Sequence, residues 1–245
     1  SASPTFTGTI NAATAILSGT LTAPIFNASE ATSTILSINN SPFLVASSTD
    51  YSFSIGFGET PALLVDGNAG NFYAFSVTGT SSGYDNVAMG YGSLSSNTSG
   101  SSNNAFGSDA LELNTSGSYN NAFGLDAGSS NTTGERNNFF GRAAGYSNTT
   151  GSYNNFIGSD AGAYNTTGSY NDYIGYRAGG NTLGSNNVAL GAYAAFNTFN
   201  GSNNVNIGYS SGRTSSNNGT STTLLGAFTE VTSSNLSTST AIGAG

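Results

Sequence analysis

The chain has 245 residues, of which 7% are charged and 34 are glycine, and its formal net charge is −8. With four cationic side chains against twelve carboxylates, a nucleic-acid-binding surface is excluded, because phosphate contacts depend on Arg and Lys. The absence of cysteine excludes disulfides and thiolate metal sites, and an aromatic share of 11% is too high for a disordered linker.

Residues 1–42 are rich in Ser, Thr and Ala and carry two similar segments, at residues 6–10 and 17–21. Each places apolar side chains at alternate positions around a Gly-Thr step, as a short extended strand does. We therefore predict an extended, fibre-like β segment, whose strands need partner chains because they offer little apolar surface. No leader-like segment begins the chain and no apolar run is long enough for a transmembrane helix, so we expect no signal peptide and no membrane span.

Residues 43–84 are predicted to form a small separate β unit. Tyr51, Phe53, Ile55 and Phe57 alternate with small residues, which is the pattern of a strand with one buried face. Two further apolar runs flank a turn-rich loop that contains an Asp-Gly step at residues 66–67. This arrangement predicts a β-hairpin.

From residue 85 to residue 245 one pattern returns about every 17 residues. The glycines that close successive copies are Gly90, Gly107, Gly124, Gly141, Gly158, Gly175, Gly191, Gly208, Gly226 and Gly243. Their spacing is 17 residues five times and then 16, 17, 18 and 17. A short fixed period marks a stacked array, and this one is too short for helical hairpins. We predict an all-β fold, a parallel β-solenoid (β-roll) of about nine coils, each with two short strands and two corners, stacked into a rod of ~43 Å.

Two columns of the repeat are singled out as structural. The residues directly before the closing glycines are all apolar and are predicted to form the core column: Met89, Phe106, Phe123, Phe140, Ile157, Ile174, Leu190, Ile207, Leu225 and Ile242. The residues four before those glycines are predicted to form a hydrogen-bonded ladder: Asn86, Asn103, Asn120, Asn137, Asn154, Asn171, Asn187 and Asn204. Each coil offers few apolar side chains, so we expect several chains to pool them in an obligate homo-oligomer, a homotrimer.

The run of residues 86–90, Asn-Val-Ala-Met-Gly, and its copies at 187–191 and 204–208 resemble the head repeats of YadA-like trimeric autotransporter adhesins. That family uses an N-x-A-I-G core and folds as a trimeric, left-handed parallel β-roll, with a shorter repeat than the one here. The unit N-T-T-G-S-Y-N-N is also similar to repeats of phage tail fibres and bacterial surface fibres. The resemblance implies a homotrimer outside the cell, as a cell-surface appendage or virion fibre.

Three surface columns are weighed for function. Tyr119, Tyr153 and Tyr170 recur with Arg136 between them, and we expect either a glycan-contacting face or packing between coils. The column of Asp109, Asp126 and Asp160, with Arg177 in the same column and Arg142 next to it, suits either an acid/base pair of a polysaccharide-cleaving enzyme or an exposed charged row. The column of Thr98, Thr115, Thr132, Thr149, Thr166, Thr182 and Thr198 would suit ice binding if it were flat.

We therefore expect a structural and adhesive extracellular fibre protein that binds a cell-surface glycan or receptor by multivalent contact. We expect no enzyme, since the chain has no His to pair with a nucleophile, and no cofactor or metal, since no calcium-loop pattern occurs. The alternatives are a tailspike-like polysaccharide depolymerase and an ice-binding β-solenoid.

Overall fold

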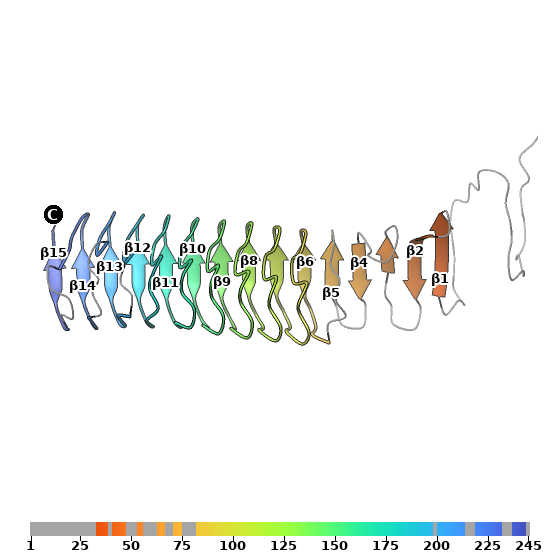
Figure 1. The fold of residues 1–245 in the computed structure, drawn as a ribbon, viewed down its shortest axis with the longest axis horizontal. Coiled ribbons are helices and arrows are strands. Elements are labelled where there is room, and N and C mark those ends of the chain that lie inside the picture. The colour runs from red at the N-terminus through yellow and green to blue at the C-terminus, as the bar shows by residue number, and fades with distance from the viewer. Residues whose placement is uncertain are drawn as a thin grey trace, which may run out of the picture.

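The computed structural model describes residues 71–74, 82–197, 200–213, 219–231 and 237–243, together with the backbone of four strands between residues 33 and 66. The Gly-Thr segments at residues 6–10 and 17–21, as well as Thr198, lie outside the described residues. All the secondary structure described is β, and it forms one sheet of 15 strands that follow one another in sequence order (Figure 1).

The strands are β1 (Ser33–Ile38), β2 (Ser41–Ser47), β3 (Phe53–Ile55), β4 (Leu63–Asp66), β5 (Asn71–Ala74), β6 (Val87–Met89), β7 (Asn104–Phe106), β8 (Asn121–Phe123), β9 (Asn138–Phe140), β10 (Asn155–Ile157), β11 (Asp172–Ile174), β12 (Val188–Leu190), β13 (Val205–Ile207), β14 (Thr223–Leu225) and β15 (Thr240–Ile242).

The first five strands pair antiparallel, and they are continuous with the repeat array. The predicted hairpin is confirmed, because β4 pairs antiparallel with β5, with Asp66 opposite Asn71. β1 and β2 also pair with each other, so the predicted boundary between residues 42 and 43 falls inside β2. β5 then pairs parallel with β6. The strands β1–β5 are therefore part of the same sheet as the strands of the repeat array.

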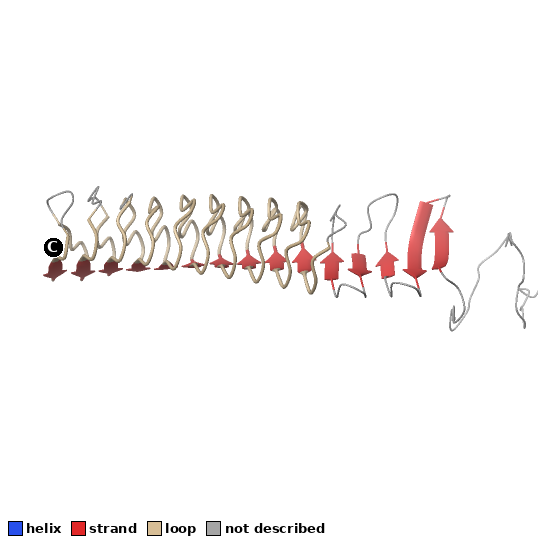
Figure 2. Ribbon diagram, turned by 90° about the horizontal axis from the view of Figure 1, so that it is seen from below, coloured by secondary structure: helices blue, strands red, loops and turns tan. Residues whose placement is uncertain are grey.

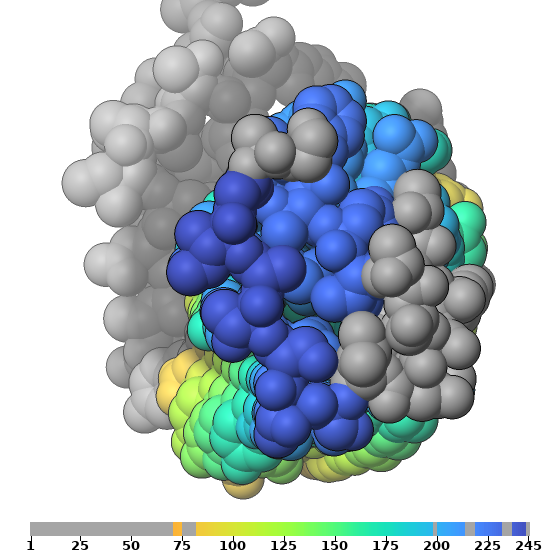
Figure 3. All heavy atoms as spheres, turned by 90° about the vertical axis from the view of Figure 1, so that its left-hand side faces the viewer, coloured from red at the N-terminus to blue at the C-terminus, as the bar shows by residue number. Residues whose placement is uncertain are grey.

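From β5 to β15 all neighbouring strands are parallel and in register, and successive strands lie one coil apart. The prediction of a parallel β-solenoid of about nine coils is confirmed. The strands lie along one edge of the rod and the turns close each coil on the other side (Figure 2). Seen along the axis, the coils lie one behind another (Figure 3).

Each described coil contains one three-residue strand and not the two that the sequence suggested. The reason lies in the backbone after the strand, where residues with positive φ alternate with others. In one coil Asp160 and Gly162 both have φ 58 and Tyr170 has φ 59. These angles are incompatible with a strand, but the turns still bond to the next coil, as when the Thr149 amide donates to the Thr166 carbonyl at 2.8 Å.

The glycine that ends each strand is required by both its angle and its surroundings. Gly158 has φ 130, and a Cβ placed on it would lie 2.6 Å from the Gly175 carbonyl oxygen of the next coil. A side chain here would clash with backbone, which cannot move aside without separating the coils. The closing glycines of the repeat therefore set the distance at which coils stack.

The predicted core column is wrong by one residue. Successive side chains of a strand point to opposite faces, so only one of two adjacent apolar columns can face inward. Phe123 and Ile157 are 38% and 41% exposed, whereas their preceding neighbours Ala122 and Phe156 are 0% exposed. The residues of the predicted column, Met89, Phe106, Phe123, Phe140, Ile157, Ile174, Leu190, Ile207, Leu225 and Ile242, lie on the outer face of the sheet.

In several coils the actual core is filled by size compensation between the middle residue of the strand and the residue six positions later. Ala88 is followed by Leu94 and Ala105 by Leu111, and all four are buried. In the middle of the rod the order is reversed, with Phe156 followed by Gly162. A Cβ on Gly162 would lie 2.5 Å from the Phe156 ring, so the narrow coil accepts one large side chain.

This compensation predicts the outcome of a double-mutant cycle. Gly162→Leu alone should destabilise the protein by about 3 kcal/mol, through overpacking and the cost of a side chain at positive φ. Phe156→Ala alone should cost about 3–5 kcal/mol through the cavity it leaves. The double variant should recover at least about 2 kcal/mol relative to the sum, because it reproduces the Ala105–Leu111 arrangement. Urea unfolding of the four proteins measures the coupling, and strictly additive effects would contradict it.

Candidate functional site

The predicted asparagine column forms a continuous ladder inside the rod. Asn137 donates from Nδ2 to the Asn120 Oδ1 at 3.1 Å and to the Gly151 carbonyl at 2.8 Å. Its Oδ1 accepts the backbone and side-chain N–H groups of Asn154 at 3.0 and 3.1 Å. All eight members from Asn86 to Asn204 are buried, and the ladder begins at Asn71, one coil earlier than predicted. It therefore has a structural role and offers no surface to a ligand.

A second buried ladder was missed. Its members, which the sequence marks as N-x-S/T sequons, are Asn97, Asn114, Asn131, Asn148 and Asn165. Asn148 is fully buried and donates from Nδ2 to the Asn131 Oδ1 at 2.8 Å and to the Gly151 carbonyl at 3.0 Å. These amide nitrogens are thus committed to the interior and are inaccessible in the folded coil. Their unbroken recurrence at the coil spacing was the available signal.

The threonine column is not a flat hydroxyl array. Thr182 is fully buried at the place in its coil that asparagine occupies in the preceding coils. In those coils the hydroxyls bond back to the backbone, as Thr149 Oγ1 does to the Thr166 carbonyl at 2.9 Å. The threonine row is therefore interrupted at Thr182, and its hydroxyls from Thr98 to Thr149 are bonded along the rod.

The outer face of the sheet carries a continuous apolar stripe. We call the ten residues of the predicted core column the strand-face stripe. Six members are 37–43% exposed, and Ile242 is 75% exposed. The other three, Phe106, Leu190 and Leu225, are half-buried. The rings of Phe106 and Phe123 stack at 4.8 Å, and those of Phe123 and Phe140 at 4.9 Å. Beside the stripe runs a row of bonded amides, in which Asn121 Nδ2 donates to the Asn138 Oδ1 at 2.9 Å.

The strand-face stripe is extensive. Seven of its ten members are at least 37% exposed, and it follows the sheet from β6 to β15. None of the ten residues is charged, and a contiguous apolar surface of this extent marks an interaction site.

The predicted tyrosine column lies at an exposed corner. Tyr119, Tyr153 and Tyr170 are 52%, 41% and 58% exposed. The Arg136 guanidinium lies 5.1 Å from the ring of Tyr119 and 5.3 Å from that of Tyr153, and the rings of Tyr153 and Tyr170 stack at 4.8 Å. The rings therefore contact one another and Arg136 across neighbouring coils and are also exposed to solvent, so both interpretations of the column stay predictions.

The aspartate column contains one defined charged cluster. Arg142 donates from one nitrogen to both carboxylate oxygens of Asp160, at 2.8 and 2.7 Å. Arg177 approaches the same carboxylate to 3.8 Å, which is too long for a hydrogen bond. Asp160 is therefore neutralised by its neighbours. Within the described residues no three carboxylates gather as metal ligands would.

An aromatic cluster on the turn side was not predicted. The rings of Tyr176, Tyr193, Tyr209 and Phe228 meet edge to face across successive coils, at 5.3, 6.4 and 5.2 Å. Phe196 joins the cluster at 5.8 Å from Tyr193. The first four of these residues stand one or two positions after the closing glycines, whereas Phe196 stands five after Gly191, and these shifts hid the cluster from a strict alignment.

Among the described residues, only Tyr173 has a clearly shifted pKa. Its side chain is fully buried against Phe156, with ring centroids 5.0 Å apart. Burial raises the pKa of the hydroxyl, because the phenolate would lose its hydration. Tyr173 is a core residue and is inaccessible to a ligand.

Protein-family models, curated proteins and solved structures were compared with the chain, and none matches. The similarity to YadA-like heads and tail fibres therefore depends on the repeat residues alone. The part of the chain that the structure describes has no helix long and apolar enough to cross a bilayer.

Proposed function

We propose that the protein is a non-enzymatic, extracellular fibre segment that acts as a homotrimer, in which three rods join along their strand-face stripes. The observation that carries this proposal is the continuous apolar stripe that follows the outer face of the sheet from Met89 to Ile242. Each coil already encloses a core of its own. The apolar side chains that the three chains would share around a common axis are therefore those of the stripes, which lie outside the coils.

Three chains suit the stripe better than two. In a three-fold arrangement each stripe lies against both neighbours, so a narrow column of side chains is covered on both flanks. The bonded amide row beside the stripe then lies at the edge of the contact, where polar groups belong in interfaces. The resemblance to trimeric head repeats points to the same number of chains.

The adhesive part of the proposal rests on the turn side of the rod. The aromatic cluster around Tyr193 lies in the turns that follow the strands. Aromatic rings with Arg beside them are suited to sugars and to other ligands with one apolar face. Three copies on one fibre would make weak contacts collectively strong.

The mass in solution tests the proposal directly. Light scattering coupled to size-exclusion chromatography should give three times the chain mass of 24.6 kDa at micromolar concentration. A mass of one chain under these conditions would contradict the trimer and with it the proposed role of the stripe.

A further inference from the structure

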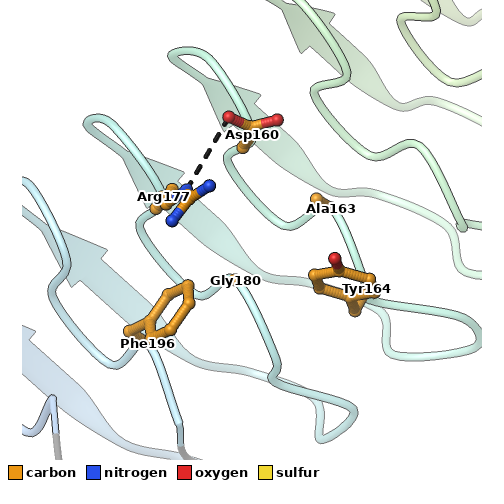
Figure 4. A pocket seen from close by; sticks show the side chains of 6 residues that line it. All are labelled: Asp160, Ala163, Tyr164, Arg177, Gly180 and Phe196. Carbon is orange, nitrogen blue, oxygen red and sulfur yellow. Dashed lines mark ion pairs between the residues drawn. The ribbon is translucent and has the colours of Figure 1, made fainter.

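A hollow on the turn side is formed by residues of three successive coils. It is lined by Asp160, Ala163, Tyr164, Arg177, Gly180 and Phe196 (Figure 4). The coils are held in register by backbone bonds, in which the Tyr164 amide donates to the Gly180 carbonyl at 3.0 Å and the Asn181 amide donates to the Phe196 carbonyl at 2.9 Å. The rings of Tyr164 and Phe196 thus come from the coils on either side of Gly180, which has no side chain.

Gly180 shapes the hollow. A Cβ on this residue would lie 2.6 Å from the Phe196 ring, so the ring leans over the glycine and forms one wall. Tyr164, which is 58% exposed, forms the opposite wall, and the small residue Ala163 lies beside it. In Figure 4 the Tyr164 hydroxyl is directed to the side on which Asp160 and Arg177 lie. The hollow is therefore apolar on its walls and polar at one end.

The charge at that end is opposite to that of the whole chain. Arg142 and Arg177 surround one carboxylate, Asp160, whereas the chain has a net charge of −8. Arg142 uses its bond to satisfy Asp160, but Arg177 stays beyond hydrogen-bonding distance and its side chain is 43% exposed. Its guanidinium donors are thus available to an anion, and a carboxylate is the partner that they fit in geometry.

We propose that this hollow binds one unit of an acidic polysaccharide, a hexuronate, with its ring against Phe196 and Tyr164 and its carboxylate at Arg177. A pyranose ring has apolar C–H faces that pack on aromatic rings and hydroxyls that bond to Tyr164 and Asp160. The net positive end selects a charged sugar over a neutral one. This inference names the ligand class of the proposed adhesive fibre and rests on that function.

The test uses titration calorimetry of the full chain with trisaccharides of galacturonate, mannuronate and glucuronate, each matched with its neutral hexose counterpart. At least one uronate should bind, and its neutral counterpart should bind at least about 10-fold more weakly. Phe196→Ala and Tyr164→Ala should each weaken uronate binding by about 10-fold, since an aromatic face is lost. Arg177→Gln should remove the preference for the charged sugar while retaining neutral binding.

Matched controls keep the outcomes distinct. Tyr170 is 58% exposed, like Tyr164, but lies at the other corner, so Tyr170→Ala should leave uronate binding unchanged. Binding to none of the three uronates by folded protein would overturn the inference, as would equal binding of charged and neutral sugars, or a loss in Tyr170→Ala but not in Tyr164→Ala. The mass of each protein is measured in parallel. A trimer that binds no uronate overturns only this inference, whereas a single chain that binds one overturns only the trimer.

Discussion

Replacing Phe123 and Phe140 together by aspartate is expected to reduce the mass in solution from three chains to one. Both side chains point outward from the sheet, with 38% exposure, and their rings stack on each other at 4.9 Å in the middle of the strand-face stripe. In a trimer the six new carboxylates would face one another around the axis without partners. Buried unpaired charges are strongly destabilising, so the association should weaken by at least roughly 100-fold.

The matched control lies on the turn side. Leu113 and Tyr146 are 45% and 44% exposed, slightly more than the two stripe residues, and they are also large and uncharged. Leu113→Asp combined with Tyr146→Asp adds the same charge to a surface that the proposed trimer leaves open, so the mass should stay at three chains. If the stripe variant keeps the wild-type mass, the strand face is not the interface.

Fold in these variants is monitored separately. Phe123→Leu with Phe140→Leu keeps the stripe apolar and should preserve the assembly. The core is formed by other residues, such as Ala122 and Phe139, which are both 0% exposed and are untouched by the changes. If the stripe is the interface, the aspartate variant should have the mass of one chain and the leucine variant the mass of three.

The sequence predicted the coil but not which side of it faces inward. Period and glycine spacing determine where each strand ends, because the closing glycine must have a φ near that of Gly158, 130, and no side chain. The residues at the middle and the end of each strand are both apolar, and their order alone does not assign a face. The deciding signal lay in pairs such as Ala105 with Leu111 and Phe156 with Gly162, in which one residue is large only when the other is small.

The candidate hollow was beyond sequence reasoning for a different reason. It joins Tyr164, Gly180 and Phe196, which come from three coils and are 16 residues apart in both steps. Phe196 stands at the same place in its coil as Gly180, whereas Tyr164 stands one place later, so they form no single column. Which side chains meet depends on how coils of 17 and 16 residues stack, and only the structure gives that stacking.

The second large effect is expected inside the rod, for Asn137→Ala. The amide of Asn137 makes four hydrogen bonds, to Asn120, to Gly151 and from two groups of Asn154. Truncation leaves the Asn154 backbone N–H buried without a partner and opens a cavity. An unsatisfied buried group costs about 1–3 kcal/mol, and the cavity adds to it, so we expect a loss of about 3–5 kcal/mol in the free energy of unfolding.

Asn181→Ala is the matched comparison, because it removes the same amide group from a less buried position. Asn181 is half-buried on the turn side, and its Nδ2 makes one bond, to the Asn197 Oδ1 at 2.9 Å. Water can replace that bond, so the free energy of unfolding should fall by less than about 1 kcal/mol. Urea unfolding of both variants measures the difference. Equal losses would mean that the coils are held together by their backbone bonds alone and that the asparagine ladder contributes no more than an exposed amide does.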